Sequence, residues 1–431
     1  MSDDLAVFLD GTRIGTLRQG GGGNVTFSYV PGYWGTRGAT PLSLSLPLVV
    51  PNHKSRPTRT FLQGLLPDSA ARLEELGRQF GVSPRNPFPL LAHMGKDAAG
   101  AVQILPEGEA SADAAVRRGD VSVIDDDQLA AVVADVIANR AEWGRRHNAD
   151  VRWSLAGAQP KIALFRAETG EWGVPNDSTP TTHILKPAVP PYSDHDINEF
   201  MTMAAARDLG LDVAEDFVLT TSRGDRALVS VRYDRRQVDG RWVRLHQEDL
   251  CQALAIPPDK KYQSDGGPGI ATIGQLFATI PQARDVRANS ERFFDAVVFN
   301  AAALGTDAHA KNYSLLLNGD RATLAPLYDL GSHAPYPTPQ GREPKLAMSV
   351  EGEYRASGVT AGLLVRAGRR LGIDEGRAFD RVTEITTGIV DAYRRAADLA
   401  RVSLGNHEFI DVMVESISEY AEQRGWASPG R

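Results

Sequence analysis

The chain lacks several features that would assign it to a class at once. Its single cysteine, Cys251, excludes an intrachain disulfide and favours a reducing compartment. No apolar run approaches the ~20 residues that a membrane span needs, and the first four residues lead into a strand pattern with no secretory leader. The net charge of −7 gives no general attraction to DNA or anionic membranes. We therefore expect a cytoplasmic protein whose nucleic-acid contacts are local or made through a partner.

The order of predicted elements runs from strands to helices. Residues 5–30 alternate like a meander of short strands, residues 67–69 begin a helix that reaches about Phe80, and residues 106–125 are polar and small like a linker. Residues 127–141 are predicted to form an amphipathic helix, and residues 151–250 are strand-rich around one helix at 195–208. Helices are then predicted at 291–304, 357–371, 375–399 and 407–423. At 431 residues the chain has room for two or three domains.

Residues 305–312, with Tyr328-Asp329 further on, carry the most specific chemical pattern. Strands at 313–317 and 323–327, joined by a turn at Asn318-Gly319-Asp320, form a predicted hairpin that returns Asp329 to the neighbourhood of Asn312. Phosphoryl transfer needs a carboxylate that accepts the proton of the attacking hydroxyl, and it needs hard oxygen ligands for Mg²⁺. Asp307 is the candidate for the carboxylate, and Asn312 and Asp329 are the candidates for the ligands. Gly305 is a plausible C′ residue ending the preceding apolar helix.

Two other interpretations of this loop are open. An Asp-x-His-x-x-Asn stretch also occurs as an ordinary turn with solvated polar groups. A metal-dependent hydrolase would use Asp307, His309 and His333, but the spacing typical of such sites is missing.

A second segment, residues 154–161, is a glycine-bearing loop between predicted strands at 151–153 and 162–165. A Walker A loop or a dinucleotide fingerprint needs a helix after the glycine, so both are rejected. A hairpin folded over nucleotide phosphates fits, and so does an ordinary hairpin. Lys186 follows at the end of a strand, where it either binds the α/β-phosphates or is a solvated edge-strand lysine. Glu199, on the next helix, either orients Lys186 or lies on the surface.

Residues 228–236 resemble a last strand running into a connector, where Tyr233 could pack on an adenine. The arginines between Arg223 and Arg244 are interleaved with aspartates, which favours a solvated, salt-bridged hairpin over a phosphate-binding or acidic-protein surface. The order is glycine hairpin, strand lysine, helix glutamate, connector, Asp-x-x-x-x-Asn, hairpin and Asp. This order predicts an α+β, bilobal, protein-kinase-like fold with a β-rich N-terminal lobe and an α-helical C-terminal lobe.

These motifs resemble the HipA toxins, which are serine/threonine-protein kinases of bacterial toxin–antitoxin pairs. The matching segments span nearly the whole chain and are residues 64–68, 95–100, 154–159, 182–186, 244–252, 262–270 and 306–312. The resemblance implies a HipA N-terminal subdomain at 1–110, a nucleotide-binding lobe at 111–255 and a catalytic lobe at 256–431.

The resemblance also implies roles by position, with ATP and Mg²⁺ as cofactors. Asp307 would accept the proton, Asn312 and Asp329 would ligate Mg²⁺, and Lys186 would bind phosphate. The nucleotide-binding residues implied are Ala156, Gly157, Ala158, Gln159, Pro160, Lys161, Lys186, Val231, Arg232, Tyr233, His309, Ala310, Lys311, Asn312, Tyr328 and Asp329. Pro160 and Val231 depart from the family, since acidic residues are expected at both positions.

The resemblance implies that the loop serine, Ser154, is an autophosphorylation site, where phosphate is expected to displace the glycine loop and shut the kinase off. The expected partners are a HipB-like helix-turn-helix antitoxin, DNA mainly through that antitoxin, and a protein substrate such as an aminoacyl-tRNA synthetase. Two alternatives are a catalytically weak corepressor that scaffolds a DNA-binding antitoxin, and a small-molecule phosphotransferase of similar fold.

Overall fold

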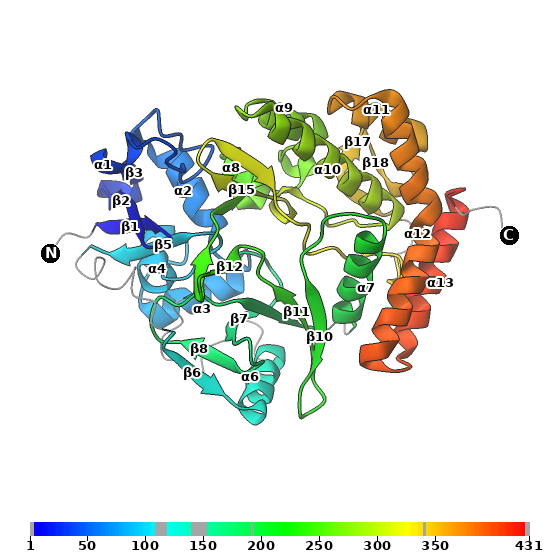
Figure 1. The fold of residues 1–431 in the computed structure, drawn as a ribbon, viewed down its shortest axis with the longest axis horizontal. Coiled ribbons are helices and arrows are strands. Elements are labelled where there is room, and N and C mark those ends of the chain that lie inside the picture. Colours follow the sequence, from blue (N-terminus) through cyan, green and yellow to red (C-terminus); the bar gives the residue numbers. More distant parts are fainter. Residues whose placement is uncertain are drawn as a thin grey trace. The chain divides into compact units, whose positions relative to one another are not determined.

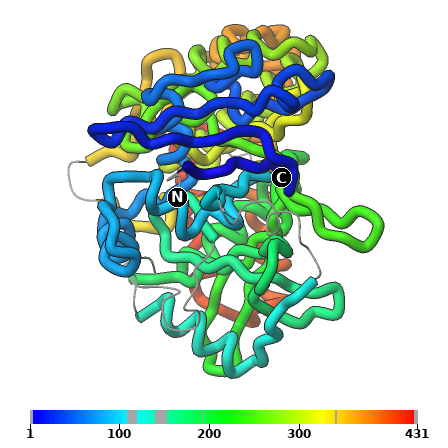
Figure 2. Tube along the Cα trace, turned by 90° about the vertical axis from the view of Figure 1, so that its left-hand side faces the viewer, coloured from blue at the N-terminus to red at the C-terminus, as the bar shows by residue number. Residues whose placement is uncertain are grey.

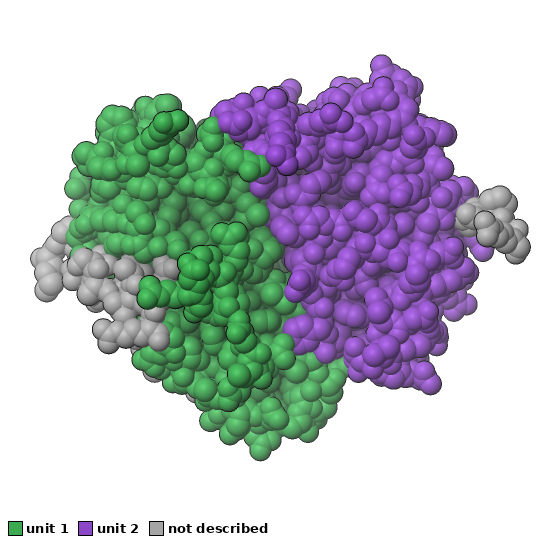
Figure 3. Space-filling model, in the orientation of Figure 1, with its two compact units in different colours: residues 1–187, 219–259, 314–322 green, residues 188–218, 260–313, 323–431 purple. Residues whose placement is uncertain are grey.

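The computed structural model describes residues 4–107, 119–138, 153–190, 192, 194–338 and 342–426. They form two compact units built from interleaved stretches of chain (Figure 3). The first unit takes residues 1–187, 219–259 and 314–322, and the second takes residues 188–218, 260–313 and 323–431. The first is rich in strands and the second in helices, as predicted (Figure 1). The domain boundaries at residues 110 and 255 stay a prediction.

An antiparallel sheet in the order β4-β3-β2-β1-β5 begins the first unit. Figure 2 shows its first strands running side by side in dark blue. The strands are β1 (Leu5–Leu9), β2 (Thr12–Gln19), β3 (Val25–Tyr29), β4 (Asn52–His53) and β5 (Val102–Pro106). The predicted meander over residues 5–30 is therefore confirmed.

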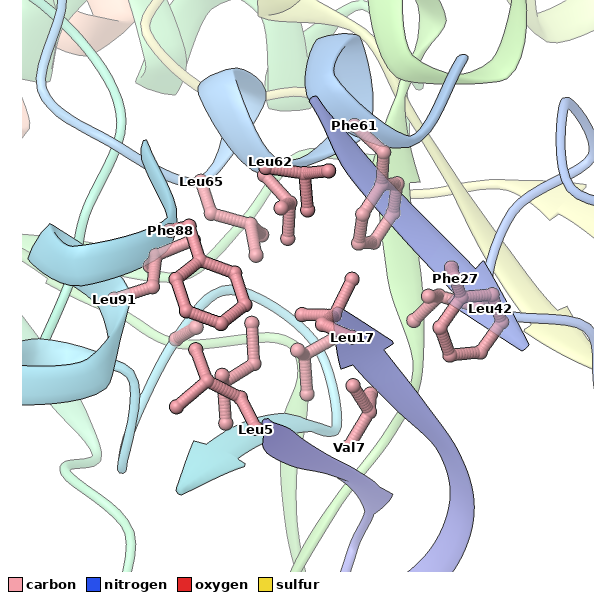
Figure 4. Packing of buried hydrophobic residues seen from close by; sticks show 14 of the residues in the cluster. Leu5, Val7, Leu17, Phe27, Leu42, Phe61, Leu62, Leu65, Phe88 and Leu91 are labelled. Atoms are coloured by element: carbon pink, nitrogen blue, oxygen red, sulfur yellow. The ribbon is translucent and has the colours of Figure 1, made fainter. Parts of the chain in front are cut away.

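Helices supply the other half of this core. They are α1 (Pro31–Trp34), α2 (Ser55–Gly64), α3 (Ala70–Phe80) and α4 (Pro87–Met94). The predicted start of α3 is confirmed, because the Ser69 hydroxyl oxygen caps it by accepting a hydrogen bond from the Arg72 N–H (3.3 Å). Figure 4 shows apolar side chains of α2 and α4 pointing toward those of the sheet; they include Leu5, Leu17, Phe61, Leu62, Phe88 and Leu91.

A second sheet has the strand order β10-β11-β9-β7-β8-β6. Its strands are β10 (Asp216–Thr220), β11 (Arg226–Val231), β9 (His183–Pro187), β7 (Ile162–Arg166), β8 (Trp172–Pro175) and β6 (Val121–Ile124). The predicted linker is wrong at its end, since β6 pairs antiparallel with β8. The amphipathic helix is present as α6 (Asp126–Ala138), and its predicted end at 139–141 lies outside the described residues.

Three short strands form a separate sheet in the order β14-β15-β16. They are β14 (Gln247–Asp249), β15 (Ser314–Asn318) and β16 (Arg321–Leu324), and a short helix, α8 (Leu250–Ala253), follows β14. Gly319 turns the predicted hairpin with φ 62°, a value that glycine adopts without strain. The second strand, predicted at 323–327, begins two residues earlier than expected. A further hairpin pairs β12 (Arg235–Val238) with β13 (Arg241–Arg244).

The second unit is mainly helical, and its helices are α7 (His195–Asp208), α9 (Ile270–Ala278), α10 (Ala283–Ala302), α11 (Ala361–Arg370), α12 (Glu375–Leu404) and α13 (Glu408–Gln423). A strand pair, β17 (Lys345–Val350) and β18 (Glu353–Arg355), accompanies them. Along α12 the side chains of Val382, Ile385, Ile389 and Tyr393 are buried, and this helical spacing lines one face. None of the described helices is long and apolar enough to cross a membrane.

Candidate active site

The loop that carries Asp307 begins at a sharp end of α10. Leu304 takes the left-handed φ of 53°, and the Gly305 N–H donates to the Asn300 carbonyl oxygen (2.7 Å). Gly305 is therefore not the left-handed C′ residue, which makes that prediction wrong; Leu304 is. Glycine is needed at 305 for a different reason, because a Cβ there would lie 2.2 Å from Asn300 Oδ1. The loop thus starts from a buried, closely packed support.

Asp307 lies exposed within this loop, and its neighbours fix its backbone. Its carbonyl oxygen accepts hydrogen bonds from the His309 N–H (2.7 Å) and from Asn312 Nδ2 (2.9 Å). Its carboxylate accepts a hydrogen bond from the Tyr262 hydroxyl. Because the amide nitrogen of Asn312 is committed to Asp307, the amide presents its oxygen as the remaining ligand atom.

His309 is the buried member of the loop. Its ring lies edge-on to Tyr262, with centroids 5.0 Å apart. Burial lowers the pKa of His309, so the imidazole is neutral at neutral pH. Within the described part of the chain, His309 Nδ1 is buried without a hydrogen-bond partner. Such an atom is expected to have a partner in the functional state.

Tyr328 and Asp329 return to this loop after β16. The Tyr328 hydroxyl donates a hydrogen bond to the carbonyl oxygen of Lys311 (2.9 Å), the residue directly before Asn312. The Tyr328-Asp329 segment therefore contacts this loop. Asp329 has φ 59°, a left-handed conformation that is uncommon outside glycine. The loop and the returning segment therefore meet within the second unit, as the predicted hairpin requires. Their roles as ligands stay a prediction.

The donor set is compatible with Mg²⁺. An amide oxygen and a carboxylate are hard ligands, and Mg²⁺ in kinase sites takes one or two such groups together with substrate phosphates and water. Among the described residues, no group of three or more His, Cys, Asp and Glu side chains is arranged to hold a metal ion. The alternative hydrolase site of Asp307, His309 and His333 is therefore wrong.

In the first unit, Lys186 lies on an interior strand. Its strand, β9, pairs with β11 on one side and with β7 on the other, and the residue is only 5% exposed. The interpretation as a solvated edge-strand lysine is wrong. Glu199, on α7 of the second unit, is likewise buried, so the interpretation as a surface glutamate is wrong too. That Glu199 orients Lys186 stays a prediction.

The glycine loop is attached at its base to the N-terminal part of the chain. Ser154 is fully buried; its hydroxyl donates to the Leu65 carbonyl oxygen (2.7 Å) and its N–H to the Asp97 carbonyl oxygen (2.9 Å). Gly157 has φ 105°, and its carbonyl oxygen accepts from the Asp68 N–H (3.0 Å). Of the strand predicted at 151–153, residues 151 and 152 lie outside the described residues, and Trp153 forms only an isolated bridge.

The loop exposes a small residue at its tip, and a lysine at its end bonds back to its main chain. Ala158 is exposed, whereas Lys161 is buried and its Nζ donates to the Ala156 carbonyl oxygen (2.9 Å). A Cβ on Gly157 would lie 2.4 Å from Lys161 Nζ, so glycine leaves room for the ammonium group. The small side chains of Ala156, Gly157 and Ala158, of which Ala158 is exposed, suit close approach to an anion.

The connector after β11 and the hairpin of β12 and β13 contribute to a buried ionic cluster that the sequence interpretation missed. Arg232, Arg235 and Arg244 are each at most 6% exposed and surround the carboxylates of Asp97 and Asp234. The prediction of a solvated hairpin is wrong for these three arginines. The Arg232 guanidinium is occupied by Asp234 (2.9 and 3.0 Å), so its side chain serves the fold.

Tyr262 is the other residue that the sequence did not assign. Its only signal was its place in the segment 262–270 that resembles the family, since a tyrosine 45 residues before Asp307 has no local pattern. Its contact with the Asp307 carboxylate makes it part of the site.

Comparison with known proteins agrees with this architecture. The profile of the "HipA-like C-terminal domain" matches residues 153–393, and that of the "HipA N-terminal domain" matches residues 5–105. A protein of Sinorhizobium fredii, Y4mE, whose name describes it as a kinase, is 37% identical over 80% of each chain. The serine/threonine-protein kinase toxin HipA of Shewanella oneidensis is 30% identical over 82% of this chain and 80% of its own length.

A solved structure covers almost the whole chain. It is a complex of HipA, HipB and operator DNA from Shewanella oneidensis, with a TM-score of 0.81 and 26% sequence identity. The match covers 98% of this chain and 97% of that one.

Proposed function

Because the chain belongs to the HipA family of serine/threonine-protein kinases, we propose that it transfers the γ-phosphoryl group of ATP to a serine or threonine of another protein. The observation that supports this most is the meeting of Asp307, Asn312 and the Tyr328-Asp329 segment within the second unit. A proton acceptor and two oxygen ligands are the protein groups that this reaction uses.

Asp307 is the proposed proton acceptor. As the substrate hydroxyl oxygen bonds to the γ-phosphorus, the bond from that phosphorus to the β–γ bridging oxygen breaks and ADP leaves. The hydroxyl proton passes to a carboxylate oxygen of Asp307. The hydrogen bond from Tyr262 and the two bonds to the Asp307 carbonyl hold the carboxylate in one orientation, which is what a positioned base requires.

Asn312 and Asp329 are the proposed Mg²⁺ ligands, and bound Mg²⁺ neutralises charge on the phosphates. The unpaired, buried Nδ1 of His309 supports a polar group of the nucleotide near this loop. The main chain of residues 309–311 and Tyr328 would then border the phosphates.

In the first unit, Lys186 is proposed to bind the α/β-phosphates, and residues 156–161 to cover them with backbone N–H groups. The place of Lys186 on the interior strand β9, after the glycine loop in the chain, supports this. The segment Val231-Arg232-Tyr233 is proposed to lie along the adenine through its backbone and the Tyr233 ring.

Regulation is proposed at Ser154. Its hydroxyl is buried and bonded to Leu65, so a phosphate at this position is incompatible with the packing seen here. Autophosphorylation would therefore expel the loop from its present place and switch the kinase off.

The proposed biological role is that of a growth-arresting toxin. The relative from Shewanella oneidensis is a toxin kinase, and the solved structure contains it with HipB and operator DNA. We infer that this chain binds a HipB-like helix-turn-helix antitoxin and reaches DNA through it. Its protein substrate is proposed to be a translation factor such as an aminoacyl-tRNA synthetase.

The deciding experiment is intact-protein mass spectrometry after incubation with ATP and Mg²⁺. The set is wild type, Asp307→Asn, and Asp380→Asn as a control with the same atomic change on an exposed position of α12. Wild type and Asp380→Asn should gain one phosphate, mapped to Ser154, while Asp307→Asn should gain none yet still bind ATP in calorimetry. Phosphate on Asp307→Asn at the wild-type rate would remove Asp307 from its role. ATP binding without transfer in wild type would favour the corepressor.

A further inference from the structure

The buried side-chain amide of Asn198, on α7, binds the backbone N–H and the backbone carbonyl of Ser332, which lies three residues after Asp329. Asn198 Nδ2 donates to the Ser332 carbonyl oxygen (2.8 Å), and the Ser332 N–H donates to Asn198 Oδ1 (2.8 Å). Asn198 is fully buried and Ser332 nearly so. The pair reproduces the two-bond pattern by which one strand residue pairs with another. It fixes both the position and the direction of the chain at Ser332.

The clamp is itself supported from two helices. The Thr202 hydroxyl, one turn along α7, approaches Asn198 Oδ1 (3.3 Å), and the Tyr393 hydroxyl of α12 donates to Thr202 Oγ1 (3.0 Å). Both supporting residues are buried. A buried amide whose partners are supplied in this way has one low-energy orientation.

The left-handed Asp329 lies three residues before the clamped Ser332. A non-glycine residue keeps such a conformation only where its surroundings impose it. On one side the Tyr328 hydroxyl is bonded to the Lys311 carbonyl oxygen. On the other side, Ser332 is held by Asn198, and the next N–H, that of His333, donates to the Leu304 carbonyl oxygen (3.0 Å) at the base of the Asp307 loop. The bend at Asp329 is thus anchored at both ends.

From this geometry we propose that Asn198 is a positioning residue for Asp329. Its amide holds the segment 330–333 so that the Asp329 carboxylate stays beside the loop of Asp307 and Asn312. The inference rests on the proposed function, because it gives the clamp a purpose only if Asp329 holds Mg²⁺. Residues that orient a metal ligand change metal affinity by about 10- to 100-fold when they are removed.

The test compares Asn198→Ala with Thr386→Val. Asn198→Ala removes both bonds to Ser332, whereas Thr386→Val removes a buried hydroxyl of α12 that bonds to the Val382 carbonyl oxygen of its own helix (2.8 Å). Without nucleotide, hydrogen exchange in residues 329–333 should be at least tenfold faster in Asn198→Ala and unchanged in Thr386→Val. Calorimetry with Mg²⁺ and ADP should show about 10- to 100-fold weaker Mg²⁺-dependent ADP binding for Asn198→Ala alone.

A third variant guards against misfolding. Asn198→Asp keeps the shape and the acceptor for the Ser332 N–H, but it replaces the donor to the Ser332 carbonyl with an oxygen. Because the new carboxylate oxygen faces the Ser332 carbonyl oxygen in a buried place, exchange in residues 329–333 should be at least as fast, and Mg²⁺-dependent binding at least as weak, as in Asn198→Ala, while exchange in α12 stays unchanged. Wild-type exchange and binding in both Asn198 variants would overturn the proposal, and so would equal effects in Thr386→Val.

Failure of the proposed function is visible separately. If the wild-type protein transfers no phosphate and its binding of ADP does not depend on Mg²⁺, the proposed function and the positioning role both fail. If the wild-type protein transfers phosphate but the Asn198 variants show wild-type exchange and wild-type binding of ADP, only the positioning role fails.

Discussion

Asp97→Asn tests the buried ionic cluster of the first unit most directly. The Asp97 carboxylate accepts hydrogen bonds from Arg235 Nη2 (3.0 Å), Arg244 Nε (3.0 Å) and the Thr181 hydroxyl (2.6 Å). Asparagine has the same shape as aspartate, but it is neutral, and its NH₂ group would face the hydrogen-bond donors of Thr181, Arg235 or Arg244. Three buried arginines would then remain with the single carboxylate of Asp234, which pairs with Arg232 and Arg235.

The size of the effect follows from that imbalance. Removing one partner of a buried ion pair costs about 3–5 kcal/mol, because the remaining charge cannot regain its hydration. For a unit of about 150–250 residues, each kcal/mol lowers the melting temperature by about 2–4 °C. We therefore expect the first unit to melt roughly 10 °C lower in Asp97→Asn.

The pH dependence gives an independent check. Burial alone would raise the pKa of Asp97, but Arg235, Arg244 and Arg232 outweigh it and hold the pKa well below the usual range. The stabilisation is therefore complete above the unfolded pKa and is lost as the pH falls below it. The difference in melting temperature between wild type and Asp97→Asn should be full at pH 7 and should shrink below about pH 4.

The assay is thermal unfolding followed by circular dichroism, with Asp4→Asn as the control. Asp4 pairs with Arg18 on the surface, where ion pairs contribute little, so the control should melt like wild type. A shift below 2 °C for Asp97→Asn at pH 7 would refute the reasoning that this cluster stabilises the first unit.

Three further outcomes are expected. Burial raises the pKa of Glu248 to about 8, so between pH 5 and 8 this carboxyl is protonated in the folded state and ionised in the unfolded state. The free energy of unfolding should therefore fall by up to about 1.4 kcal/mol per pH unit over this range. Urea titrations should show this slope in wild type but not in Glu248→Gln. Gly305→Ala should destabilise the second unit by about 1–3 kcal/mol through overpacking against Asn300, and should slow phosphotransfer at least tenfold in a radiolabelled-ATP assay. Ser154→Ala should stay active after wild type has inactivated itself, so matching progress curves for the two would remove Ser154 from regulation.

Local patterns predicted the elements that local physics controls. The boundaries of α7 and the turn at Gly319 follow from helical spacing and from glycine's tolerance of positive φ, both of which are visible in a few residues. The loop that carries Asp307 and Asn312 is also visible in the sequence, because the two residues are five positions apart on one turn-rich segment. Tertiary context was not needed for any of these.

What the sequence could not give depends on partners distant along the chain. The bond from Tyr262 to Asp307 and the clamp between Asn198 and Ser332 join positions separated by 45 and 134 residues. The sequence predicts solvated arginines near β12, because their nearest aspartates in the chain favour a surface hairpin. Asp97, which makes burial tolerable, comes from an unrelated stretch.

The interleaving of the two units has a consequence for how the protein is made. Strand β15 pairs with β14 in the first unit, with Leu315 opposite Glu248 and Leu316 opposite Gln247. A ribosome synthesises this strand only after residues 188–218 and 260–313 of the second unit, so the first unit cannot be completed early in translation. A fragment that stops before residue 314 leaves β14 without its neighbour. Truncation of the chain before residue 314 is thus a poor route to an isolated first unit.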